Sequence, residues 1–147
     1  MILIGGGSSD RRSISGYCYK MADNSSLVSW RSKKQSTVAL STCEAEYIAL
    51  TYAIQEGMFL RQLLSDMEGN PKMTVNLFVD NKGAIDLAKN PVHHQRTKHI
   101  DIRYHYIRSL IKDDTVNMQY IPSADNIADM FTKPVTKKNL HKFNVCY

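Results

Sequence analysis

The chain has 147 residues, of which 43% are hydrophobic and 22% charged, a composition that suits one globular domain over residues 1–147. No apolar run approaches membrane-spanning length, so we expect no membrane partner. The formal net charge of +5 favours a polyanionic partner. The three cysteines are widely spaced and show neither metal-ligand spacing nor a disulfide framework, which predicts a reducing, intracellular compartment.

Hydrophobic periodicity and turn residues predict a mixed α/β order of elements. Strands are predicted over residues 1–5, 14–21, 27–31, 74–80 and 116–121. Helices are predicted over residues 41–68, 84–88, 99–112 and 123–131. A glycine-rich start over residues 1–9 and a basic tail over residues 135–147 flank these elements. The pattern indicates an α/β domain whose sheet mixes a hairpin with helix crossovers.

The longest predicted helix begins with a capping box. Ser41 and Glu44 have the spacing at which the serine side chain binds the glutamate amide while the glutamate side chain reaches back. Gly57 interrupts the apolar stripe of this helix at a cost of about 1 kcal/mol relative to alanine. We therefore expect the helix to pack closely on a sheet at Gly57.

A carboxylate follows a buried strand. The apolar run of residues 77–79 ends on Asp80, and the next residues turn into a short helix. The carboxyl end of a buried strand is where open α/β sheets usually place their chemistry. Aspartate is also common as a helix cap, so both interpretations of Asp80 stay open at this point.

Metal-dependent phosphodiester hydrolysis needs acidic residues from different elements that hold two divalent ions about 3.5–4 Å apart. Glu46 is one candidate because it flanks the buried face of the long helix, although a solvated helix charge is the simpler interpretation. Glu44 has a sufficient reason in its capping role. Spacing alone does not separate Asp125 from Asp129, and Asp86 reads as a surface residue.

Other catalytic chemistries find no support in the sequence. His93 and His94 are adjacent, and His99 and His105 do not share a helical face, so no zinc site is expected. No Gly-x-Ser-x-Gly elbow, P-loop or dinucleotide-binding pattern occurs. Cys43, at the start of the long helix, is expected to be a packing residue.

Several motifs can be read together. They are DRRSISGY at residues 10–17, SWRSKKQ at 29–35, STCEAEYIAL at 41–50, VDNKGAI at 79–85, RTKHIDIRYH at 96–105 and NIADMFTKP at 126–134. In this order they resemble the ribonuclease H domain of copia-type LTR retrotransposon Pol polyproteins. The resemblance runs from about residue 10 to the C terminus.

The resemblance implies a ribonuclease H-like fold, a five-stranded mixed sheet flanked by helices. It also implies cleavage of the RNA strand of RNA–DNA hybrids with two divalent ions, Mg²⁺ or Mn²⁺. Three of the family's four active-site carboxylates, which are catalytic residues and metal ligands, carry over onto Glu46, Asp80 and Asp129. The carry-over favours Glu46 over Glu44 and Asp129 over Asp125.

The fourth carboxylate of the family has no match. It belongs to the first strand, whose place is taken here by residues 1–9, and no acid occurs before Asp10. A first strand shortened in this way predicts weak or lost hydrolysis. Some members of the wider superfamily have a histidine on the loop before the last acidic residue, and here Ser123, Ala124 and Asp125 occupy that loop.

Basic and polar side chains near the expected active site are suited to bind nucleic acid. The residues predicted to contact nucleic acid are Lys33 and Lys34 in the polar connection after the hairpin, Asn81, Lys82, Arg96 and Lys98. Lys137, Lys138 and Lys142 are expected to be solvated. The expected partners are an RNA–DNA hybrid and a reverse transcriptase domain of the same polyprotein. The expected location is the cytoplasm, in a virus-like particle, or the nucleus.

Two other interpretations stay open on sequence. A decayed or domesticated domain keeps the fold and its basic edge as a non-catalytic binding module. A genomic remnant with a shortened first strand folds poorly.

Overall fold

The computed structural model describes residues 2–5, 12–21, 26–69, 73–90, 98–132 and 134, and within these ranges it leaves out the side chains of residues 2–5, 43 and 98–101. The strands are β1 (Ile2–Gly5), β2 (Ile14–Lys20), β3 (Leu27–Lys34), β4 (Val75–Val79) and β5 (Val116–Tyr120). The helices are α1 (Thr42–Glu68), α2 (Lys82–Lys89) and α3 (Lys98–Lys112). Two 3-10 turns follow, η1 (Ser123–Asp125) and η2 (Ile127–Phe131).

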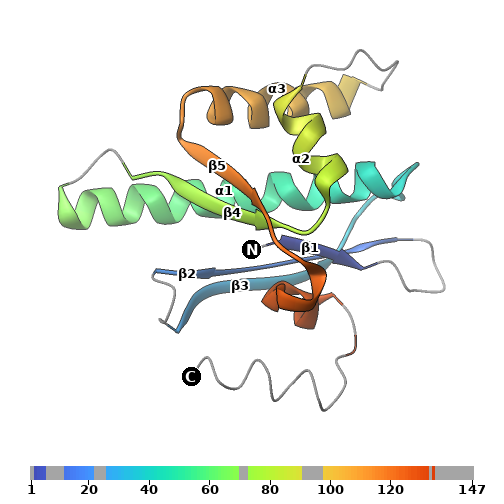
Figure 1. The fold of residues 1–147 in the computed structure, drawn as a ribbon, viewed down its shortest axis with the longest axis horizontal. Coiled ribbons are helices and arrows are strands. Elements are labelled where there is room, and N and C mark those ends of the chain that lie inside the picture. The colour runs from blue at the N-terminus through green and yellow to red at the C-terminus, as the bar shows by residue number, and fades with distance from the viewer. Residues whose placement is uncertain are drawn as a thin grey trace.

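The strands form one mixed sheet in the order β3-β2-β1-β4-β5. Strands β1, β2 and β3 pair antiparallel, while β4 is parallel to both β1 and β5. Figure 1 shows the long helix α1 running beside this sheet. The predicted mixed α/β class, with a hairpin and helix crossovers, is therefore confirmed.

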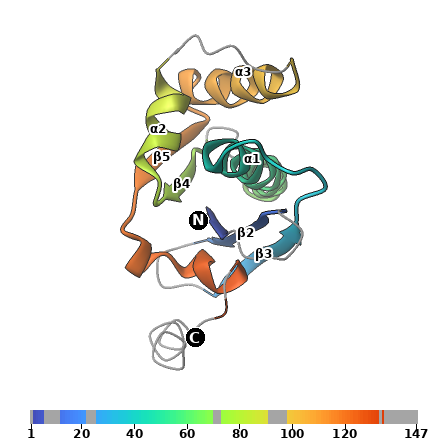
Figure 2. The same cartoon turned by 90° about the vertical axis from the view of Figure 1, so that its right-hand side faces the viewer.

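The strand β2 is buried on both faces. Tyr17 and Tyr19 point to the face that α1 covers, whereas Cys18 lies between them on the opposite face and packs with Ala128 of η2. Gly16 makes this second contact close, because a Cβ atom there would lie 2.5 Å from Thr132 Cγ2. Figure 2 shows α1 and η2 on the two sides of β2.

The main core lies between α1, the central strand β4 and α3. Leu50 and Ile54 of α1, Leu77 of β4 and Ile107 of α3 are at most 2% exposed. The rings of Tyr47 and Tyr104 stack with centroids 3.8 Å apart, which joins α1 to α3. These contacts hold the amino-terminal half of α1 in a defined position relative to the end of β4.

The cap of α1 confirms the prediction for Ser41. The Glu44 amide donates to Ser41 Oγ at 3.1 Å. The Glu44 carboxylate accepts a hydrogen bond from the Leu40 amide at 2.7 Å, one residue before the position that the capping box predicts. Glu44 therefore stabilises the start of α1, which is the capping role predicted for it.

The close approach predicted at Gly57 is confirmed. A Cβ atom at Gly57 would lie 2.6 Å from the Tyr19 hydroxyl and 2.9 Å from Val75 Cγ1. The same hydroxyl donates to the Ala53 carbonyl at 2.6 Å. Only a residue without a side chain leaves room for this contact between α1 and the sheet.

Two predictions about elements are wrong. The late helix over residues 123–131 is two 3-10 turns, because Asn126 is fully buried between them and its Oδ1 accepts from the Ala128 amide at 3.1 Å. Lys33 and Lys34 do not form a connection after the hairpin, because β3 continues through them, paired with Ser15 and Ile14.

Other predictions concern residues outside the described ranges. The glycine-rich segment after residue 5, Asp10, Arg96 and the tail over residues 135–147 lie there. Within the part of the chain that the structure covers, no helix combines the length and the apolar character needed to cross a membrane.

We expect Gly57→Ala to lower the free energy of unfolding by about 1–2 kcal/mol, because the cost of overpacking exceeds the gain in helix propensity. Urea unfolding followed by circular dichroism measures the change. Tyr19→Phe is the matched background, since it removes the hydroxyl that the new methyl group meets. Gly57→Ala should cost less in that background, and an equal cost in both would contradict the contact.

Candidate carboxylate site at the carboxyl end of β4

The first carboxylate, Asp80, lies at the carboxyl ends of the parallel strands β4 and β5. Val79 of β4 pairs with Tyr120 of β5, and the Ile121 amide donates to the Val79 carbonyl at 3.0 Å. Asp80 and Ser123 follow these strand ends and therefore meet, with Ser123 Oγ donating to Asp80 Oδ2 at 2.6 Å. Pro122 stands at the cap position of η1, so no side chain caps this turn and Ser123 Oγ is available to Asp80.

Asn81 joins this edge to α1. Its Oδ1 accepts from the Ala84 amide at 3.1 Å, which caps α2. Its Nδ2 donates a hydrogen bond to Glu46 Oε2. One amide side chain therefore fixes the start of α2 and the position of Glu46 at once.

Three effects act on the pKa of the Glu46 carboxyl group. Burial raises its pKa above the ordinary value, the nearby charge of Asp80 raises it further, and the hydrogen bond from Asn81 opposes both effects. A raised pKa at a half-buried carboxylate beside a second carboxylate is a common mark of a functional site. The structure thus brings Glu46 and Asp80 together, as predicted for a site built from α1 and β4.

Asp129 lies in η2, next to the strands β1 and β2, and its side chain is partly buried. Its carbonyl accepts from the amide of Thr132 at 3.0 Å. Asp125 lies in η1 and is exposed. The assignment of Asp129 rather than Asp125 to the site stays a prediction of the family resemblance.

The fit of divalent ions depends on how many acidic side chains converge. Within the described residues, no three His, Cys, Asp or Glu side chains gather closely enough to hold a metal ion. Glu46 and Asp80 form a pair, and each already accepts a hydrogen bond from a neighbour. These carboxylates alone do not supply the ligands that two Mg²⁺ ions need.

The predicted nucleic-acid contacts divide between the two edges of the sheet. Lys82 lies at the β5 edge, where its Nζ stands 4.6 Å from the centroid of the Tyr120 ring. Lys33 and Lys34 are exposed on β3, the opposite edge strand. Lys98 begins α3, and its side chain lies outside the description.

Comparison with known proteins places the relatives of this chain among the Pol polyproteins of retrotransposons. The chain is 42% identical over 137 residues, 93% of its length, to the retrovirus-related Pol polyprotein from transposon TNT 1-94 of Nicotiana tabacum. It is 33% identical over 94% of its length to the corresponding polyprotein from transposon RE1 of Arabidopsis thaliana, and 32% over 95% to that from transposon RE2.

The chain is therefore homologous over most of its length to retrotransposon Pol polyproteins. It spans only about a tenth of these relatives, 10% of the first and 9% of the other two. Searches of protein-family models and of solved structures give no match.

Glu46→Gln should change how stability depends on pH. Because the folded state raises the pKa of Glu46, folding favours its protonated form. The free energy of unfolding of the wild type therefore falls as pH rises from the ordinary glutamate pKa through the raised one. Glutamine keeps the acceptor for Asn81 and removes this loss.

Between about pH 4 and pH 8, the free energy of unfolding of Glu46→Gln should rise relative to that of the wild type by at most about 1 kcal/mol. The effect is small because solvent screens the partly exposed carboxylate. Urea unfolding across this range measures the difference. Asp86→Asn, an exposed carboxylate of α2, is the control. Parallel pH profiles for Glu46→Gln and the wild type would show that the carboxylate is not perturbed.

Proposed function

We propose that this chain is a ribonuclease H-like domain of a copia-type retrotransposon Pol polyprotein, which binds RNA–DNA hybrids and hydrolyses them weakly or not at all. The homology to retrotransposon Pol polyproteins supports the origin. The five-stranded mixed sheet, in the order β3-β2-β1-β4-β5 with α1 across it, supports the fold.

The pair of Glu46 and Asp80 is the observation that carries the proposal. The two carboxylates come from α1 and the end of β4, and they meet at a sheet edge, with Asn81 between them. Two-metal hydrolysis of phosphodiesters relies on carboxylates that come from different elements and converge at one place, and this pair supplies two of them. Asp129 is the proposed third member of the set.

The proposed weak activity follows from the small number of converging carboxylates and from the hydrogen bonds that they already accept. Among the described side chains there is a pair rather than a cluster, and Asn81 and Ser123 already donate to it. We therefore propose that Mg²⁺ or Mn²⁺ binds poorly here.

Binding to nucleic acid needs only the basic surface. The net charge of +5 attracts phosphate, and the exposed Lys82, Lys33 and Lys34 supply candidate contacts. Such contacts are read through the backbone and sugars of the hybrid rather than through its sequence. Arg96 and Lys98 are further proposed contacts. A reverse transcriptase domain of the parent polyprotein is the proposed protein partner, in a cytoplasmic virus-like particle or the nucleus.

The test is to measure binding and cleavage of one labelled RNA–DNA hybrid in parallel. With about five phosphate contacts, affinity should fall by about 500-fold between about 50 and 200 mM salt. Cleavage in Mg²⁺ or Mn²⁺ should stay near the background of Asp80→Asn, which serves as the matched control. Asp80→Asn keeps an acceptor for Ser123 and should fold like the wild type.

Absence of binding at low salt would overturn the proposed nucleic-acid function. Robust cleavage that Asp80→Asn abolishes would overturn the proposed loss of hydrolysis and would indicate a complete metal site.

A further inference from the structure

An exposed aromatic ring lies beside the carboxylate pair. Tyr120, the last residue of β5, is 48% exposed, although it shares its face of the strand with the buried Val116 and Met118. It pairs with Val79, the residue before Asp80. Because neighbouring strands are about 4.8 Å apart, Tyr120 starts next to the strand end that carries the site. A large ring is therefore open to solvent at the point where the carboxylate site meets the surface.

A lysine lies over one face of this ring. Lys82 Nζ stands 4.6 Å from the centroid of the Tyr120 ring. Lys82 is itself exposed at the start of α2, and a lysine side chain is long and flexible. A contact of this kind between an exposed ammonium group and a ring is weak. The ammonium group can therefore leave the ring for a phosphate, and the ring face that it leaves is reachable from solvent.

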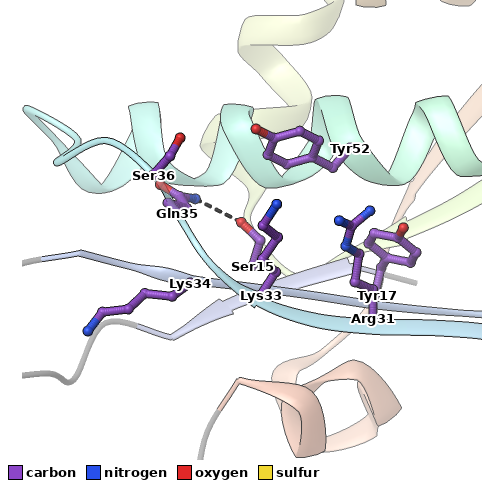
Figure 3. Close-up of a pocket in the computed structure, with 8 residues that line it drawn as sticks. All are labelled: Ser15, Tyr17, Arg31, Lys33, Lys34, Gln35, Ser36 and Tyr52. Atoms are coloured by element: carbon purple, nitrogen blue, oxygen red, sulfur yellow. Dashed lines mark hydrogen bonds between the residues drawn. The ribbon is translucent and has the colours of Figure 1, made fainter.

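The other cations that stand over aromatic rings in the described part of the chain meet rings of the core or its border. Arg108 Cζ is 5.7 Å from the centroid of Tyr104, which is 5% exposed. Arg103 Cζ is 5.9 Å from the centroid of Tyr52, a half-buried ring of α1 in the wall of the pocket that Figure 3 shows. Of these three rings, Tyr120 is the one that a ligand can cover.

An exposed ring beside a cation suits a nucleotide whose base is unpaired. The ring can stack on the face of any base, and the cation can contact the phosphate. Base stacking on an aromatic ring is stronger than an exposed contact between lysine and a ring, so a base can displace Lys82 Nζ from Tyr120. A base inside a duplex already stacks on its neighbours, whereas an unpaired base has a free face.

We propose that Tyr120 and Lys82 bind one unpaired nucleotide at the end of an RNA–DNA hybrid. The base stacks on the ring, and the phosphate contacts the ammonium group. The inference rests on the proposed nucleic-acid function and adds to it a preference for hybrids with a single-stranded end. Because Tyr120 pairs with the residue before Asp80, a hybrid bound in this way places its end beside Glu46 and Asp80.

The experiment compares the binding of two hybrids that carry the same charge. One has a single unpaired nucleotide at a strand end, and the other has an abasic nucleotide there, which keeps the sugar and phosphate but lacks the base. The wild type should bind the first hybrid about tenfold more tightly. The nucleotide is placed at each of the four strand ends in turn, so the end that shows this preference identifies the bound strand as RNA or DNA.

Three variants assign the preference to the ring. Tyr120→Leu should bring the ratio of the two dissociation constants close to one, whereas Tyr120→Phe keeps the ring and should keep the ratio. Trp30→Leu is the matched control, since it removes a 61% exposed ring from β3, at the opposite edge of the sheet, and should leave the ratio unchanged. Thermal melts show whether each variant is folded.

A second arm locates the base by crosslinking. 5-Iodouridine, or its deoxy form in the DNA strand, replaces the unpaired nucleotide, and irradiation joins it to an aromatic ring on which it is stacked. Peptide mass spectrometry should find the crosslink on Tyr120 in the wild type and no crosslink at this position in Tyr120→Leu.

The outcomes separate this inference from the proposed function. No preference for the base at any strand end, or a preference that Tyr120→Leu keeps, overturns the nucleotide site alone. A wild type that does not bind the hybrid overturns the proposed function. In that case a single-stranded oligonucleotide with 5-iodouridine tests the ring by itself: a crosslink on Tyr120 supports the nucleotide site, and crosslinks only elsewhere, or none, overturn it.

Discussion

The close packing of α1 on the sheet is the constraint on which the other features depend. Ala49 and Ala53 are fully buried, and Gly57 leaves no space for a side chain. These small residues let the helix axis approach the strands, where the Tyr19 hydroxyl bonds the Ala53 carbonyl. A larger residue in this row would lift α1 and with it Glu46, which has to reach the end of β4.

The helix held in this way serves two polar sites on its two sides. On one side Glu46 meets Asn81 and Asp80, and on the other the Ala45 carbonyl orients Gln35. Both sites place polar atoms in partly or fully buried surroundings, where each hydrogen bond matters more than in water. At the first site Asn81 and Ser123 donate hydrogen bonds to the carboxylates of Glu46 and Asp80. At the second site Gln35 Oε1 accepts no hydrogen bond from the described residues.

The elements that the sequence predicted well are those with a strong local signal. The helix α1 has a cap, a small-residue stripe and a clear end at Gly69, whose positive φ of 67° suits glycine. The prediction of a helix over residues 123–131 is wrong because the buried Asn126 interrupts it, and burial depends on tertiary structure. The end of β3 was placed too early because Lys33 and Lys34 look like a loop, although an edge strand tolerates such side chains.

The sequence by itself determined the mixed α/β class, the capping role of Glu44 and the candidacy of Asp80, since each depends on periodicity or spacing within one segment. Only the tertiary structure decided which side chains meet: Asn81 with Glu46, Ser123 with Asp80, and Gln35 with Arg31 and Lys33 around one pocket. These contacts join residues 35 and 43 positions apart in the first two cases. Spacing along a chain carries no signal for such pairs, because strand order and helix packing set their distance.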